Sequence, residues 1–152
     1  MQLTGAVINE LRGYESILKH IAVDAIGIGA GVTDRLKEEG FPAIGVNVSG
    51  GSMRADGMEF ANRRAYYYWF LREIIRSGRL GGYLSPETIS QLTQIHYGYK
   101  SNGEIFIESK DDMTKRGMKS PDHADGLMLC FAPIARSTGN WGYIGQQKDY
   151  NF

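Results

Sequence analysis

The segment IAVDAIGIGAG, residues 21–31, decides the fold. Its first eight residues, 21–28, form a short apolar run with no polar alternation, which favours a strand buried on both faces of a parallel sheet. The closely spaced glycines predict a tight turn, and residues 32–39 then read as a helix that Gly40 ends. Residues 43–48 form a second apolar run. A strand, a helix and a strand in this order predict a crossover that joins two parallel strands.

Helical patterns and turn signals lie on both sides of this unit. The remaining expected helices cover residues 3–18, 59–76, 85–95 and a stretch opening at Ser120-Pro121-Asp122, and a glycine-rich loop is expected over residues 49–57. Two short runs flank Ser101-Asn102-Gly103, and Asn-Gly is a strong signal for a β-hairpin over residues 97–107. The chain is polar after Pro133, so we expect a folded domain over residues 1–135 and a polar tail over 136–152.

The composition is that of an ordinary globular chain. With 152 residues, 42% of them hydrophobic and 22% charged, it is long enough for one core and too apolar for wholesale disorder. The 17 basic and 17 acidic residues balance, so binding to nucleic acid requires locally clustered charge. A single cysteine, Cys130, excludes an internal disulfide and a cysteine-based zinc site. Glu10, Arg12 and Glu15 interrupt the first apolar positions, which predicts neither a signal peptide nor a membrane span, and therefore a soluble intracellular protein.

Asp24 is the first candidate functional residue, because it lies inside an otherwise apolar strand. An ionised carboxylate is costly to bury unless it is paired or bound to a metal. Asp24 either caps the next turn through the amides of Gly27 or Gly29, or faces a ligand at the carboxyl end of the sheet, and the sequence leaves both interpretations open. The glycine turn departs from the dinucleotide-binding pattern, because Val32 takes the place of the third glycine, and we interpret it as backbone clearance beside Asp24.

Asp122 and Asp125 form a second acidic candidate at the start of the last predicted helix. Their i, i+3 spacing places them on one helical face. Asp122 is explained equally well by the helix dipole, whereas Asp125 lies one turn deeper and requires a partner. A strand aspartate and a helix aspartate that are remote in sequence are a common way to hold a divalent cation against a phosphodiester. Their hard oxygen ligands suit magnesium or manganese.

A third candidate is the mixed-charge stretch over residues 108–119. Such a stretch is usually a solvated helix face. Its basic members flank the helix of Asp125 and would also suit contacts to phosphate oxygens. The candidate nucleic-acid contacts are Lys110, Lys115, Arg116 and Lys119.

Four blocks of sequence together resemble the nuclease domain of phage terminase large subunits, in an order and spacing that extend over roughly residues 3 to 132. The blocks are VDAIGIGAGVTDRL (residues 23–36), FANRRA (60–65) followed by Trp69 and residues 71–73, IESKDDM (107–113) and SPDHADGL (120–127).

The resemblance implies an α/β, ribonuclease H-like three-layer fold and a metal-dependent endonuclease that hydrolyses phosphodiester bonds of double-stranded DNA during packaging. It implies Mg²⁺ or Mn²⁺ held by three acids, with Asp24 in the place of the second, Asp125 in that of the third and Asp122 as an auxiliary ligand. It also implies the portal and the small terminase subunit as partners, no membrane, and the cytoplasm of a bacterial host.

The resemblance also predicts an incomplete domain. In that family the first carboxylate lies on a strand before the helix that begins here near Leu3, and this chain opens at that helix. We expect an exposed sheet edge through which two copies associate, together with reduced metal affinity. Two alternatives stay open: a catalytically silent module that binds DNA or another motor component, and, ranked behind it, a nucleotide-binding domain that uses the glycine turn.

Overall fold

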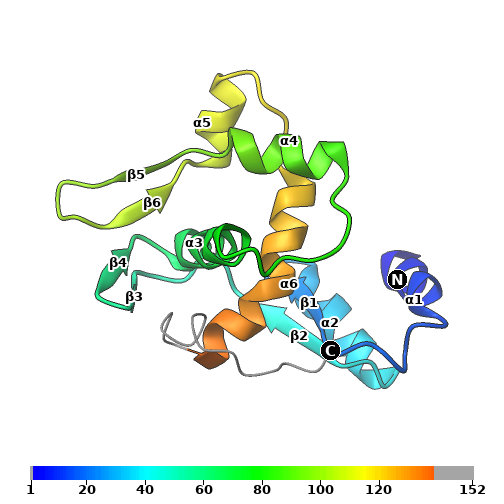
Figure 1. Cartoon of the computed structure of the whole chain (residues 1–152). Helices are drawn as coiled ribbons and strands as arrows, with labels where there is room; N and C mark the ends of the chain where they lie inside the picture. Colours follow the sequence, from blue (N-terminus) through cyan, green and yellow to red (C-terminus); the bar gives the residue numbers. More distant parts are fainter. Residues whose placement is uncertain (1, 139–152) are drawn as a thin grey trace. The chain divides into compact units, whose positions relative to one another are not determined.

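The computed structural model describes residues 2–138, which fall into two compact units that meet in sequence between Val48 and Ser49 (Figure 1). The first unit contains α1 (Gln2–Leu11), β1 (Ile21–Asp24), α2 (Gly29–Glu38) and β2 (Ala43–Val46). The second contains β3 (Met53–Ala55), β4 (Met58–Phe60), α3 (Arg63–Arg76), α4 (Pro86–Gln94), β5 (Tyr97–Tyr99), β6 (Ile105–Ile107), α5 (Lys110–Lys115) and α6 (Asp122–Thr138).

The first unit confirms the predicted crossover. Strands β1 and β2 pair in parallel, with Ile21 opposite Ala43 and Asp24 opposite Val46, and α2 joins them. Apolar side chains of α2 and β2 are fully buried where the helix packs on the strands, as at Leu36. Helix α1, which packs on α2, is shorter than predicted.

Glycine geometry explains why β1 ends at Asp24 and not at residue 28. Gly27 has a φ of +65°, which side chains rarely adopt, so the strand cannot continue through it. A Cβ at Gly29 would lie 1.6 Å from the carbonyl oxygen of Asp24, so this close approach requires glycine. The interpretation of the glycine turn as backbone clearance beside Asp24 is therefore confirmed. Helix α2 already begins at Gly29, three residues earlier than predicted.

The second unit holds a four-stranded sheet in the order β3-β4-β6-β5. The predicted hairpin is confirmed, with β5 antiparallel to β6, and β4 pairs with β6 in parallel. The predicted loop over residues 49–57 is wrong in its second half, because β3 and β4 form a hairpin there. Asp56 and Gly57 at its turn both have positive φ, as the tight hairpin turn requires. Helix α3 consequently begins at Arg63 instead of 59, and Asn62 caps it by accepting a hydrogen bond from the amide of Ala65.

Helix α3 is the core of the second unit. Every residue from Ala65 to Leu71 is buried, because α6 packs on one side of the helix and the sheet on another. The aromatic residues from Tyr66 to Phe70 are part of this core. Helix α6 also packs against α4 and continues past Pro133 to Thr138, so the first residues of the predicted tail are helical, and residues 139–152 lie outside the described part of the chain. None of the described helices is both long and apolar enough to span a membrane.

Candidate functional site

Asp24 ends strand β1 and is partly buried. Its Oδ1 atom accepts a hydrogen bond from the backbone amide of Ile26 at 3.1 Å. Of the two interpretations that the sequence left open, the structure shows a capping bond, made with the amide of Ile26 and not with those of Gly27 or Gly29. One carboxylate oxygen carries this bond, so the capping role and a ligand role are chemically compatible.

Asp125 is the centre of a polar cluster in the second unit. Its side chain is 16% exposed and accepts from three donors on two other helices. Tyr68 Oη donates to Oδ1 at 2.6 Å, and the Arg64 guanidinium lies 3.4 Å from the same oxygen. The Lys110 ammonium lies 2.7 Å from Oδ2. The sequence predicted that Asp125 needs a partner, and the structure provides three: the hydroxyl of Tyr68 and the cations of Arg64 and Lys110.

Helix α3 supplies two of these donors from adjacent turns. Arg64 and Tyr68 are four residues apart, so their side chains lie on the same helical face, and the Arg64 guanidinium stacks 4.9 Å from the Tyr68 ring centre. Arg64 also donates to the backbone carbonyl of Glu108 at 3.0 Å. Its Nε atom is buried without a partner among the described residues. This geometry fixes Arg64 firmly against the carboxylate of Asp125.

Tyr68 remains a hydrogen-bond donor across the whole ordinary pH range. Burial raises the pKa of its phenol far above the usual value, and the charge of Asp125 and the hydrogen bond to it raise that pKa further. The hydroxyl therefore stays protonated and keeps one oxygen of Asp125 in a fixed position.

Lys110 is the first residue of α5, and this position brings its ammonium group to Asp125. Ser109 caps α5 by accepting from the amide of Asp112 at 3.1 Å, which places Lys110 in the first turn. The Lys110 side chain is 53% exposed, whereas that of Arg64 is 15% exposed. Of the two cations beside Asp125, Lys110 is therefore the one whose side chain can change conformation without disturbing buried neighbours.

The start of α6 is held by a side chain from α4. Gln91 Oε1 accepts from the amides of His123 and Ala124 at 2.9 and 3.1 Å, so it occupies the capping position of the helix that carries Asp125. Asp122 is exposed and accepts from the Ser120 hydroxyl at 2.6 Å. This contact places Asp122 at the start of α6, and no hydrogen bond or ion pair in the described part of the chain links it to the cluster around Asp125.

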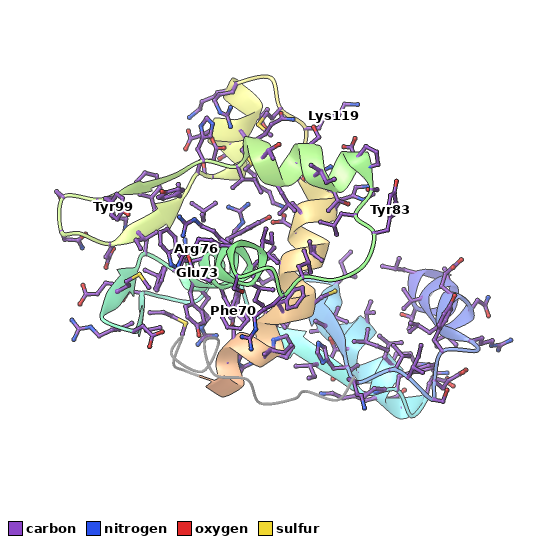
Figure 2. The ribbon with its side chains drawn as sticks, in the orientation of Figure 1. Phe70, Glu73, Arg76, Tyr83, Tyr99 and Lys119 are labelled. Carbon is purple, nitrogen blue, oxygen red and sulfur yellow. The ribbon has the colours of Figure 1, made fainter. Side chains whose placement is uncertain are left out.

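The remaining predicted nucleic-acid contacts differ in their surroundings. Lys115 is exposed and pairs with Asp112 at 2.9 Å. Lys119 is exposed in the segment between α5 and α6 (Figure 2). Both ammonium groups are accessible to an anion, as the sequence interpretation requires.

The guanidinium of Arg116 is engaged in hydrogen bonds to other residues of the second unit. Its Nε donates to Glu108 Oε2 at 3.1 Å, and its Nη2 donates to the backbone carbonyl of Gln94 at 2.9 Å. Burial alone would raise the pKa of the Glu108 carboxyl, but the hydrogen bonds from Arg116 and from the His96 amide lower it more, so the net shift is downward. This ion pair holds the end of β6 and the end of α5 together, which fixes the segment that delivers Lys110.

Sequence reasoning missed three residues of this cluster. They are Arg64, Tyr68 and Gln91, none of which the sequence analysis singled out as a functional candidate. The i, i+4 spacing of Arg64 and Tyr68 was the available signal. Gln91 left no signal, because a cap supplied by another helix has no local sequence pattern.

The donor chemistry fits a hard divalent cation only in part. Asp24 and Asp125 are carboxylates, which Mg²⁺ and Mn²⁺ prefer, and Asp125 Oδ2 already accepts a cation in the form of the Lys110 ammonium. No group of three or more His, Cys, Asp or Glu side chains suited to a metal ion is found among residues 2–138.

Comparisons with known proteins identify the relatives of this chain. The probable terminase large subunit of Enterobacteria phage P7 is 32% identical over 122 residues, which are 76% of this chain and 24% of that protein. This chain thus spans about a quarter of the length of that curated relative. No protein-family model matches.

Solved structures give the fold. The nuclease domain of the large terminase subunit gp2 of bacterial virus Sf6 matches with a TM-score of 0.61 and 24% identity, over 84% of this chain and 68% of that chain. A mutant of that domain with manganese matches with a TM-score of 0.62 and 24% identity, over 84% and 69% of the two chains. The expected fold is confirmed: the chain is related to phage terminase large subunits in sequence and has the ribonuclease H-like α/β fold of their nuclease domain.

Proposed function

We propose that this chain is a metal-dependent endonuclease part of a DNA-packaging terminase, which hydrolyses phosphodiester bonds of double-stranded DNA. The observation that carries the proposal is Asp125, a carboxylate oriented by three donors in a chain with the fold of a terminase nuclease domain. Solved relatives with manganese and with calcium support a divalent cation, Mg²⁺ or Mn²⁺, as the cofactor.

In this proposal Asp24 and Asp125 bind the cation, and Asp122 is an auxiliary ligand. The cation, when bound, polarises the scissile phosphate and lowers the pKa of an attacking water. Tyr68 and Arg64 hold Asp125 in one orientation, so its oxygens do not need to be ordered when the cation arrives. Lys110 neutralises the carboxylate before that step.

Basic side chains near α5 would hold the DNA without reading its sequence. Lys110, Lys115 and Lys119 are exposed and suit contacts to phosphate oxygens. Arg116 would contribute indirectly, since its pairing with Glu108 keeps the segment in place.

The wider biology follows from the same relationship. Double-stranded DNA, the portal and the small terminase subunit are the proposed partners, and the bacterial cytoplasm the proposed location. We also propose that residues 1–135 act as the nuclease part, that 136–152 form a polar tail, and that copies of the chain associate through a sheet edge.

The test is nicking of supercoiled plasmid by the purified chain with Mn²⁺. We expect nicking that Asp125→Asn abolishes, because the amide is a weaker ligand without charge. Asp34→Asn removes an exposed aspartate on α2 and serves as the matched control, with activity unchanged. Absence of nicking, or nicking that persists in Asp125→Asn, contradicts the proposal.

A catalytically silent DNA-binding module is the second candidate. This candidate is favoured because the carboxylate of Asp125 already faces the cations of Arg64 and Lys110, which compete with a metal ion for its oxygens. This candidate predicts salt-sensitive DNA binding with no cleavage and no change of melting temperature with Mn²⁺. A cation that binds only the folded chain raises that temperature, so thermal melts with and without Mn²⁺ separate the two candidates.

A further inference from the structure

The second unit carries an apolar groove of about 520 Å³ between α3, α4 and the β5–β6 hairpin. We name it the α3–α4 groove. Tyr68, which donates to Asp125, lies in its wall, and none of its other lining residues belongs to the proposed nuclease site. The lining residues that matter here are Trp69, Arg72, Ile75 and Arg76 from α3 and Ile89 and Leu92 from α4.

The walls of the groove are apolar and accessible. Ile75 is 42% exposed and Ile89 is 48% exposed, although both are branched aliphatic side chains. Exposed apolar side chains gathered in one concave surface mark interaction sites. A groove bordered by two helices is the form that receives the apolar face of a bound segment.

The charge along the groove is positive. Arg72 and Arg76 line it, and both pair with Glu73 on the same helix. The Arg76 guanidinium lies 2.8 Å from the Glu73 carboxylate, and Figure 2 labels these two residues. One carboxylate is thus shared by two guanidinium groups. No aspartate or glutamate lines the groove in the described part of the chain, so one positive charge is left uncompensated there.

Arg72 is fixed over the aromatic part of the lining. Its guanidinium lies 4.5 Å from the ring centre of Trp69 and 5.8 Å from that of Tyr97. Trp69 and Tyr97 themselves meet edge to face at 5.3 Å. A planar cation held in this way presents its remaining N–H groups to a carboxylate at little conformational cost.

We propose that the α3–α4 groove is a docking site for an apolar segment of another protein that carries an aspartate or glutamate beside its apolar side chains. The apolar side chains fill the groove, and the carboxylate pairs with Arg72 and Arg76. This docking goes beyond the proposed nuclease activity and does not depend on it.

The experiment selects binders of the full chain from a library of random peptides. The double variant Ile75→Asp, Ile89→Asp removes the apolar walls and serves for counter-selection, and circular dichroism with thermal melting checks that it folds. Both positions are exposed, so their substitution leaves the core intact. We expect enrichment of peptides that combine large apolar residues with Asp or Glu.

Charge reversal then tests the carboxylate contact, with one enriched peptide labelled for fluorescence anisotropy. Arg76→Glu should weaken its binding about five-fold at low salt, as loss of one exposed ion pair allows. Arg79→Glu reverses an exposed charge outside the groove and should leave the affinity unchanged. Three outcomes overturn the proposal: no enrichment over the double variant, enrichment of neutral or basic peptides, or equal effects of the two reversals. Plasmid nicking by the double variant should equal wild type, so failure here is distinct from failure of the nuclease proposal.

Discussion

Removal of the Tyr68 hydroxyl tests whether Asp125 is oriented as described. Tyr68→Phe keeps the buried ring and deletes only the donor that lies 2.6 Å from Asp125 Oδ1. A hydrogen bond to a charged group contributes about 1.5–3 kcal/mol. Arg64 and Lys110 still satisfy the carboxylate, so the lower end applies and we expect a loss of about 1.5 kcal/mol in the free energy of unfolding. For a chain of this size that corresponds to about 3–6 °C in melting temperature.

A double-mutant cycle isolates the contact. Urea unfolding of the wild type, Tyr68→Phe, Asp125→Ala and the double variant gives the coupling free energy, which we expect to be about 1 kcal/mol or more. Tyr66→Phe is the matched control, because its hydroxyl lies on the same helix and donates to the backbone carbonyl of Ala135 at 2.7 Å. Its cycle with Asp125→Ala should show no coupling. Additivity of Tyr68→Phe and Asp125→Ala would refute the reasoning.

Three further predictions follow from the same cluster. Lys110→Ala removes a cation that competes for Asp125 and should tighten Mn²⁺ binding about five-fold, measured by titration calorimetry. Glu108 has a lowered pKa in the folded chain, so its contribution to stability is complete above its ordinary pKa and disappears as the pH falls through the lowered one. Melting temperatures of wild type and Glu108→Gln should therefore converge at acid pH. Gln91→Ala should lower the free energy of unfolding by about 1 kcal/mol in urea, because α6 loses its cap.

Each of these predictions has a control. Lys115→Ala removes an exposed cation that pairs with Asp112 and should leave Mn²⁺ affinity unchanged. Glu87→Gln, at an exposed position in the first turn of α4, should follow the wild-type pH profile. Gln91→Glu keeps the acceptor for the α6 amides but exchanges the hydrogen bond to Glu87 for a repulsion, so it should be more stable than Gln91→Ala and less stable than wild type. If a variant behaves like its control, the role assigned to the substituted side chain is contradicted.

The first unit and the hairpin were predictable because their signals are local. An apolar run followed by close glycines specifies a strand that enters a helix, and Asn102-Gly103 specifies a turn. The β3–β4 hairpin was missed because three-residue strands are too short for a periodic pattern. Asp56-Gly57 was the signal for its turn, and the glycine-rich composition around it was interpreted as loop.

The need of Asp125 for a partner was predictable from the sequence, and the identity of its partners was not. Asp125 stood out because a carboxylate on a buried helix needs a partner, a requirement of chemistry that can be read from one residue. Which partners satisfy it depends on how α3, α5 and α6 pack, and no local pattern specifies that. For Arg116, the charged stretch around it predicted a contact with phosphate oxygens. In the folded chain its guanidinium donates to Glu108, a contact that depends on tertiary packing and has no local sequence signal.

The cluster around Asp125 has an excess of positive charge, and this excess has a function in the proposed nuclease. One carboxylate faces Arg64 and Lys110, so the surface attracts a phosphate even before a cation is present. Arg64 is held by the Glu108 carbonyl and the Tyr68 ring, whereas Lys110 is more than half exposed. In the proposed nuclease, a divalent cation bound at Asp125 would therefore take the place of Lys110 and not of Arg64. The Lys110 ammonium would then be available to contact a phosphate of the DNA backbone, so in this proposal Lys110 neutralises Asp125 in the absence of the cation and binds the substrate in its presence.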